Sequence, residues 1–136
     1  MKHLFIAALC LAGFMQVVAQ EPLKDWANFG RYKEANAAVQ QPVKVVFMGN
    51  SITDGWPAAD PDFFTKNGYV GRGIGGQVSA QMLMRFRQDV INLKPQAVVI
   101  LAGTNDLAHN DYAVTPEQTF DNVVSMVQLA QANGIK

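Results

Sequence analysis

The chain has 136 residues, of which 49% are hydrophobic, 16% charged and 10% aromatic, and this composition excludes an intrinsically disordered protein. The length allows one domain, and 11 basic residues balance 11 acidic ones, so bulk charge recruits neither nucleic acid nor an anionic membrane. With 1 cysteine and 2 histidines the chain has neither a disulfide scaffold nor a histidine-rich metal site, and we expect no cofactor and no metal.

The first 19 residues have the pattern of a secretory signal peptide. A short basic start precedes an apolar segment, residues 4–18, which only Gln16 interrupts, and the small residues at 17–19 fit a signal-peptidase site. As a helix this segment spans roughly 22 Å, less than the ~30 Å hydrocarbon core of a bilayer. We therefore predict a cleaved signal peptide at 1–19, a secreted or periplasmic protein and no stable membrane anchor; an uncleaved anchor is the alternative.

Cys10 lies in the middle of this apolar segment. It follows Leu9, whereas a lipoprotein cleavage site has a small residue at that place, so we interpret Cys10 as part of the signal peptide. Removal of residues 1–19 leaves a chain without a thiol. Such a chain fits an oxidising compartment and has no cysteine nucleophile.

Residues 20–42 form a lead-in to the domain. Trp26, Phe29, Tyr32 and Lys33 recur at helical spacing, which predicts a short amphipathic helix packed on the edge of the domain. We interpret the aromatic residues as packing contacts, in preference to a role in ligand stacking.

Residues 44–48 are the first strong element of the domain. This continuous, largely β-branched apolar run predicts a central strand buried on both faces. Asp60 followed by Pro61 is a typical helix start, with an N-cap residue and proline in the first turn. A short extended piece at 69–70 then leads into the glycine-rich segment 71–76.

A helix is predicted over residues 78–93, ending before Pro95. Its apolar face repeats at helical spacing and consists of Met82, Phe86, Val90 and Leu93. Residues 97–102 then predict a second long buried strand.

The last predicted helix begins with a capping box at 115–118 and ends near residue 132, before the turn at 133–134. Its expected apolar face consists of Phe120, Val123, Val124, Val127 and Ala130. Strands that alternate with helices predict an α/β domain with a parallel sheet over residues 43–136. Because residues 134–136 have the pattern of a turn into another strand, we expect the domain to be truncated before its last strand or strands and helix.

Polar residues follow the predicted strands at three places, residues 49–53, 73–77 and 103–106. Taken singly, Ser51 can be a helix N-cap, Gly76 a turn glycine and Asn105 an Asx-turn residue. Taken together they supply a nucleophile and two hydrogen-bond donors, since reactive groups gather at the carboxyl ends of parallel strands. A serine that attacks a carbonyl, with backbone and amide N–H groups around the developing oxyanion, is the arrangement for acyl transfer.

The sequences GNSITDGW (49–56), GIGGQ (73–77) and GTND (103–106) resemble, in this order, blocks I, II and III of the SGNH (GDSL-like) hydrolases. The resemblance covers about residues 43–136 and implies a flavodoxin-like three-layer α/β/α fold and ester hydrolysis. It implies Ser51 as the nucleophile. It also implies an oxyanion hole made of the Ser51 N–H, the Gly76 N–H and the Asn105 side chain. Asn50 stands where many members of the family have aspartate.

One part of the family pattern is not found. The general base of these enzymes is a histidine in an Asp-x-x-His block near the carboxyl terminus, and no such block follows Gly134. Asp106 and His109 have this spacing but directly follow Asn105, and we interpret them as a loop feature. A serine without a base is a poor nucleophile, so we expect this chain alone to be inactive. The alternative function is that of a non-catalytic remnant, or of a fragment of the same fold that binds carbohydrates or esters.

Two further interpretations concern the ligand. Residues 71–76 match G-x-G-x-x-G, but only a short strand precedes them and no acidic residue ends a strand ~20 positions later, which disfavours a dinucleotide site. Within the family that the motifs resemble, export, the variant GNSITDGW and Trp56 fit bacterial members that remove acyl groups from polysaccharides or glycosides, which implies a small-molecule or carbohydrate ester as the partner. Trp56, beside the nucleophile, can stack on a sugar or pack within the protein, and the sequence leaves both open.

Overall fold

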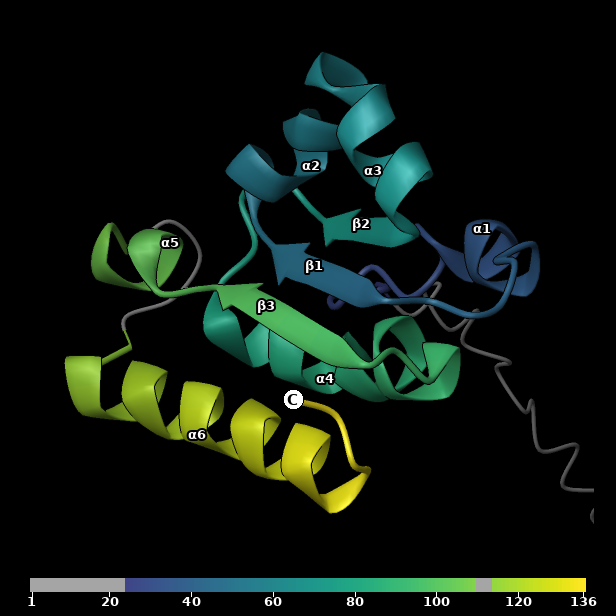
Figure 1. The fold of residues 1–136 in the computed structure, drawn as a ribbon. Coiled ribbons are helices and arrows are strands. Elements are labelled where there is room, and N and C mark those ends of the chain that lie inside the picture. Colours follow the sequence, from purple (N-terminus) through teal and green to yellow (C-terminus); the bar gives the residue numbers. More distant parts are fainter. Residues whose placement is uncertain (1–23, 110–113) are drawn as a thin grey trace, which may run out of the picture.

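The apolar runs of the sequence form a parallel sheet. The computed structural model describes residues 24–109 and 114–136, so the predicted signal peptide lies outside the described residues. The strands are β1 (Val45–Gly49), β2 (Tyr69–Gly73) and β3 (Ala97–Leu101), and they lie in the order β2-β1-β3 (Figure 1). Val45 pairs with Tyr69 on one side and with Ala97 on the other.

Helices cover both faces of this sheet (Figure 1). One face carries α2 (Ser51–Ala59) and α3 (Pro61–Asn67); the other carries α4 (Ser79–Asp89), the short helix η1 (Ile91–Leu93) and α6 (Pro116–Ala132). Helices α1 (Lys33–Ala37) and α5 (Thr104–Leu107) lie beside the sheet. The predicted flavodoxin-like α/β/α fold is confirmed. Strand β2 is added on one side of β1 and β3 on the other, so the order of strand addition reverses between β1 and β3. Open α/β folds bind ligands at such a point.

The main core lies between the sheet and helices α4 and α6. Val46 and Met48 of β1 face Met82 and Phe86 of α4, and all four side chains are fully buried together with Met126 of α6. The four residues predicted as the apolar face of the helix over 78–93 are all buried, although Val90 and Leu93 lie after the end of α4. Burial of these large side chains is the main stabilising contribution of this layer.

The other face of the sheet carries an aromatic cluster. Phe47 of β1 lies edge-on to Trp56, with ring centroids 5.2 Å apart, and Phe63, Phe64 and Tyr69 surround it. Trp56 stacks on Phe63 with centroids 5.0 Å apart and an interplanar angle of 10°. One face of the Trp56 ring is therefore covered by a neighbouring side chain, which favours packing over sugar stacking.

The lead-in is less helical than its pattern predicts. Only α1 forms, and Trp26 and Phe29 lie in turns that precede it. The Asp25 carboxylate accepts hydrogen bonds from the N–H groups of Phe29 and Gly30, both at 2.9 Å. This local side-chain-to-backbone bonding competes with helix formation and holds a turn instead.

Two elements differ in their bounds from the prediction. Strand β2 runs to Gly73 and so contains the first glycines of the segment 71–76. The helix that follows ends at Asp89, and the chain tightens into η1, where the Leu93 N–H bonds to the Val90 carbonyl at 3.1 Å. This tighter turn keeps Leu93 in the core.

Strand β3 is not buried on both faces, and this prediction was wrong. Val99 is 48% exposed and Leu101 is also exposed, because α2 and α3 cover the sheet only over β1 and β2. The apolar face of α6 is likewise only partly buried: Met126 and Ala130 pack into the core, whereas Phe120 is 67% exposed. An apolar pattern predicts an element, but not how much of it the neighbouring elements cover.

Candidate active site

The three predicted segments lie at one edge of the sheet. Ser51 lies two residues after the end of β1, Gly76 lies in the turn after β2, and Asn105 lies in α5 after β3. Because the strands are adjacent and parallel, all three segments are at the carboxyl edge. The strands that precede Ser51 and Asn105 thus pair directly and end at the same edge of the sheet.

Ser51 is the first residue of α2 and is exposed to solvent. The N-cap of this helix is Asn50, whose side chain accepts a hydrogen bond from the Ile52 N–H at 3.2 Å. The interpretation of Ser51 as the helix cap is therefore wrong, since the buried Asn50 has that role. Among the residues that the structure describes, none forms a hydrogen bond with the Ser51 hydroxyl, and it lies next to the positive end of the helix dipole.

The segment 73–77 passes very close to α2. A Cβ atom at Gly73 would lie 2.0 Å from the Asp54 nitrogen, so only glycine fits there. The next contact is a hydrogen bond from the Gly75 N–H to Asp54 Oδ2 at 3.1 Å, and a Cβ at Gly75 would lie 3.8 Å from Ser51 Cβ. The segment is thus held against the helix that begins at Ser51.

Gly76 has a backbone conformation that side chains avoid. Its φ is +78°, in the left-handed region, and a Cβ atom built there would meet no heavy atom within 4 Å. Gly76 is therefore exposed and open to an approaching group. Two of the glycines that match G-x-G-x-x-G, Gly71 and Gly73, instead lie inside β2 against α2, where a phosphate has no room.

Asn105 links the third segment to the second. Its Nδ2 donates to the carbonyl of Gln77 at 2.9 Å, a bond to the segment that follows β2. The next residue, Asp106, is fully buried and accepts from the Ser79 N–H at 2.9 and 3.0 Å and from the Ser79 hydroxyl. Asn122 of α6 also donates to that hydroxyl, at 2.9 Å. The Asp106 carboxylate thus fixes the end of β3 to the start of α4.

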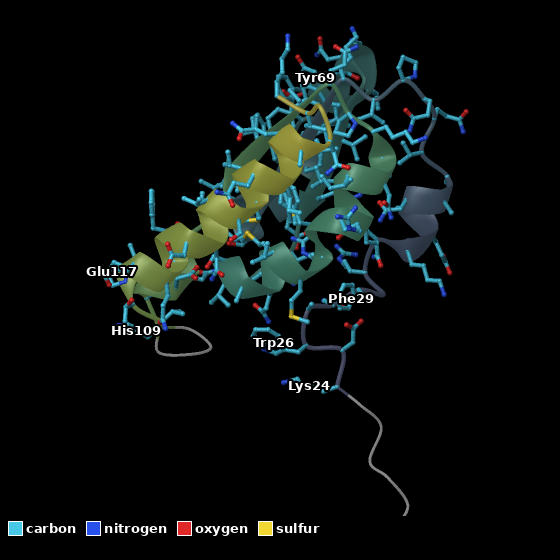
Figure 2. The ribbon with its side chains drawn as sticks, turned by 90° about the horizontal axis from the view of Figure 1, so that it is seen from below. Lys24, Trp26, Phe29, Tyr69, His109 and Glu117 are labelled. Atoms are coloured by element: carbon cyan, nitrogen blue, oxygen red, sulfur yellow. The ribbon has the colours of Figure 1, made fainter. Side chains whose placement is uncertain are left out.

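His109 is exposed at the end of α5 with a φ of +52°. Figure 2 shows it well apart from Trp26, which lines the surface next to Gly76. The Asp106 carboxylate is buried and bonded to Ser79, whereas the His109 side chain is exposed, and no ion pair joins the two among the described residues. Within residues 24–109 and 114–136 there is no cluster of three or more histidine, cysteine and acidic side chains suited to a metal ion.

A buried polar network lies beneath the three segments, and the motifs of the sequence do not predict it. Arg85 and Asp89 of α4 form an ion pair of 2.9 Å and are fully buried. Burial lowers the pKa of the Arg85 guanidinium, and the hydrogen bond and charge of Asp89 oppose this shift. The available signal was charge on an apolar helical face, since Arg85 and Asp89 are interleaved with Met82 and Phe86.

The lead-in forms one wall of a hollow beside Gly76. This hollow has a volume of about 400 Å³, and its lining includes Lys24, Asp25, Trp26 and Gly76. Gln81 of α4 donates to the Trp26 carbonyl at 2.9 Å and so holds the lead-in in place. In the part of the chain that the structure describes, no helix has the length and apolar character to cross a bilayer.

Several solved structures are similar to this chain. A candidate acylhydrolase from Bacteroides fragilis is 59% identical with a TM-score of 0.80, over 84% of this chain and 57% of that chain. A GDSL-like lipase from Bacteroides thetaiotaomicron is 59% identical with a TM-score of 0.78, over 81% of this chain and 56% of that one. An acetyl xylan esterase is 27% identical with a TM-score of 0.58, over 69% of this chain and 55% of that one.

Among curated proteins, the lipoprotein YqeF of Bacillus subtilis, itself uncharacterized, is 34% identical over 67 residues, 47% of this chain and 28% of that protein. This chain therefore spans little more than half the length of the two Bacteroides structures. Its match to YqeF covers 28% of that protein. The sequence profile of the GDSL-like lipase/acylhydrolase family matches residues 47–136, which include all three strand-end segments. The chain belongs to the GDSL-like lipase/acylhydrolase family, the SGNH hydrolases that its motifs resemble.

Proposed function

We propose that the protein hydrolyses carboxylic esters with Ser51 as the nucleophile. The oxyanion hole then consists of the Ser51 N–H, the Gly76 N–H and the Asn105 side-chain amide. The observation that supports this most is the convergence of the three segments: Gly75 lies beside Ser51, and Asn105 Nδ2 is 2.9 Å from the Gln77 carbonyl. Membership of an acylhydrolase family supports the same reaction class.

The reaction follows from the chemistry of these groups. The Ser51 Oγ attacks the ester carbonyl carbon while its proton passes to a general base, and the carbonyl oxygen becomes an oxyanion stabilised by the N–H donors. The ester C–O bond then breaks, the alcohol leaves with the proton, and water releases the acid from the acyl-enzyme. The position of Ser51 at the start of α2 adds the favourable field of the helix dipole.

The general base is a separate question. Asp106 is bonded to Ser79, so His109 has no carboxylate partner in Asp106. We assign the base to the Asp-x-x-His block that the resemblance implies for the complete enzyme. Since this chain spans 57% of the Bacteroides fragilis structure, the complete enzyme is the protein to assay.

We propose O-acetylated carbohydrates as the substrate class. The residues that line the hollow beside Gly76 include the charged Lys24 and Asp25 and the aromatic Trp26, and this mixed lining suits a hydroxyl-rich alcohol better than an acyl chain. The similarity to an acetyl xylan esterase supports the same class. Export fits a polysaccharide substrate. It is supported by the signal-peptide pattern and by a relative named as a lipoprotein.

The test compares three esters in the complete enzyme: p-nitrophenyl acetate, p-nitrophenyl palmitate and an acetylated xylo-oligosaccharide. We expect turnover of the two acetyl esters and little of the palmitate. We also expect Ser51→Ala to reduce turnover to the residual level that binding and oxyanion stabilisation leave. The matched control is Ser125→Ala on α6, which should leave the rates unchanged.

Other results would point elsewhere. Binding of the oligosaccharide without turnover would support the alternative, a non-catalytic carbohydrate-binding protein. Palmitate as the best substrate would contradict the substrate class. For export, mass spectrometry of the protein from the cell envelope or medium should find Gln20 at the amino terminus, and an intact Met1 would contradict cleavage.

A further inference from the structure

Arg85 contacts the ends of β1 and β2 and the turn after β2, which lead to the first two segments of the candidate site. Its side chain is fully buried and extends from α4 beneath the carboxyl edge of the sheet. Nη2 donates to the Gly49 carbonyl at 3.3 Å, Nη1 to the Arg72 carbonyl at 3.0 Å, and Nε to Gln77 Oε1 at 2.6 Å. A further bond joins Nη1 to Asp89 at 2.9 Å. One guanidinium thus reaches the ends of two strands and the turn after the second.

The acceptors of Arg85 are next to the proposed reacting groups. Gly49 is two residues before Ser51, and Gln77 directly follows Gly76. The carbonyl of Gln77 in turn accepts the hydrogen bond from Asn105. We propose that Arg85 is a positioning residue that fixes the nucleophile turn and the oxyanion-hole segment relative to each other. This inference rests on the proposed function of Ser51, Gly76 and Asn105.

Stability alone does not explain this residue. A buried ion pair gains little over well-packed apolar side chains, because removing both charges from water costs about as much as their attraction returns. The ion pair with Asp89 neutralises the charge, and Asn36 donates to Asp89 at 2.6 Å. The remaining donors of Arg85 all go to the segments of the site. The planar fork of the guanidinium aims several N–H groups in fixed directions, which the single ammonium of lysine does not.

The expected effect is on kcat, because Arg85 touches the segments and not the substrate. A misplacement of ~1 Å in the reacting groups can cost about 100-fold in rate. In Arg85→Lys the charge opposite Asp89 is kept, but the simultaneous bonds to Gly49, Arg72 and Gln77 are lost. We expect kcat for p-nitrophenyl acetate to fall ~10- to 100-fold, with KM within about twofold of the wild-type value.

The experiment measures kinetics and hydrogen exchange in the complete enzyme. Arg87→Lys is the matched control, since Arg87 is exposed on the same helix. Exchange should rise in residues 73–78 of Arg85→Lys and stay unchanged in α6, and the control should match the wild type in both measurements. If Arg85→Lys does not fold, the neutral double variant Arg85→Met/Asp89→Asn replaces it, because it leaves no unpaired buried charge.

Three results would overturn the inference. The first is a wild-type kcat in a folded Arg85 variant, and the second is an equal rise of exchange in α6, which indicates general destabilisation. The third is a change confined to KM. Ser51→Ala, assayed in parallel, separates the two hypotheses: turnover that persists there contradicts the proposed function. In that case unchanged exchange in residues 73–78 of the Arg85 variant would still contradict the positioning role.

Discussion

Two regions of the molecule reverse the usual distribution of polar and apolar side chains. Beneath the carboxyl edge of the sheet, Arg85, Asp89 and Asp106 are fully buried. Over β3 and the start of α6, large apolar side chains are exposed, among them Val99 and Phe120. The first region is dense in hydrogen bonds, whereas the second consists of side chains that have lost little contact with water.

The difference separates what holds the fold from what shapes the site. Buried charges contribute little net stability, but with every donor matched they fix backbone segments to within small displacements. Exposed apolar side chains contribute little stability either, since the hydrophobic effect scales with the area removed from water. The stability of the fold therefore comes mainly from the core around Met82, Phe86 and Met126, between these two regions.

The largest expected effect comes from comparing two phenylalanines. Phe86 is fully buried in the core and Phe120 lies in the exposed apolar region. We expect Phe86→Ala to lower the free energy of unfolding by ~3–5 kcal/mol and Phe120→Ala by less than about 0.5 kcal/mol. Urea unfolding followed by circular dichroism measures both. Equal losses would mean that the exposed region stabilises the fold as much as the core does.

After the end of β3, helix α5 carries the buried Asp106 next to the exposed Leu107, and Asn105 precedes both. Asn105→Ala should lower kcat of the complete enzyme ~100- to 1,000-fold with little change in KM, because the amide bonds the oxyanion mainly in the transition state. Leu107→Ala is the matched control, since Leu107 is exposed on the same short helix. Steady-state kinetics decides, and a raised KM with a normal kcat would assign Asn105 to substrate binding.

A smaller effect is expected at the buried carboxylate of Asp106. Asp106→Asn loses the charge-assisted bonds to the Ser79 N–H and hydroxyl, and we expect it to lower the free energy of unfolding by ~1–3 kcal/mol. Asp121→Asn on the exposed side of α6 should change it by less than ~0.5 kcal/mol. Thermal unfolding compares the two variants. Equal stability of both would show that the buried carboxylate does not hold β3 to α4.

The smallest effect concerns an exposed charge outside both regions. Hydrogen bonds from the Gly30 and Phe29 N–H groups lower the pKa of Asp25 below its usual value of 3.8. A lowered pKa in the folded state stabilises the lead-in turn above about pH 4, and this stabilisation is lost as the pH falls through the lower folded value. Fluorescence of Trp26 in a Trp56→Phe background should follow this change between about pH 5 and 2. Asp25→Asn should abolish it, and an identical titration in that variant would assign it to another group.

The order of elements and the three segments could be predicted from the sequence because they depend on local patterns. Residues 44–48 and 97–102 are apolar runs, Pro61 and Pro116 mark helix starts, and the strand-end residues carry a family pattern. The shared edge of Ser51 and Asn105 then follows from parallel pairing alone.

Features that depend on tertiary neighbours could not be predicted in this way. The exposure of Val99 depends on how far α2 and α3 extend over the sheet. The turn at Asp25 replaces a helix because of bonds that a periodic pattern does not contain. The role of Arg85 requires the positions of Gly49 and Arg72, which are distant in the sequence.

The choice of acceptors by Arg85 has a consequence for how the site can evolve. The acceptors at Gly49 and Arg72 are main-chain carbonyls, which every amino acid provides. Replacing Lys24 or Trp26 at the hollow therefore leaves these two bonds in place, whereas Gln77, which also lines the hollow and bonds Arg85 through its side chain, has to be kept. Directed evolution toward esters of new alcohols can therefore randomise Lys24 and Trp26 while Arg85 is kept. The specificity for the alcohol can then change without moving the N–H groups of the proposed oxyanion hole.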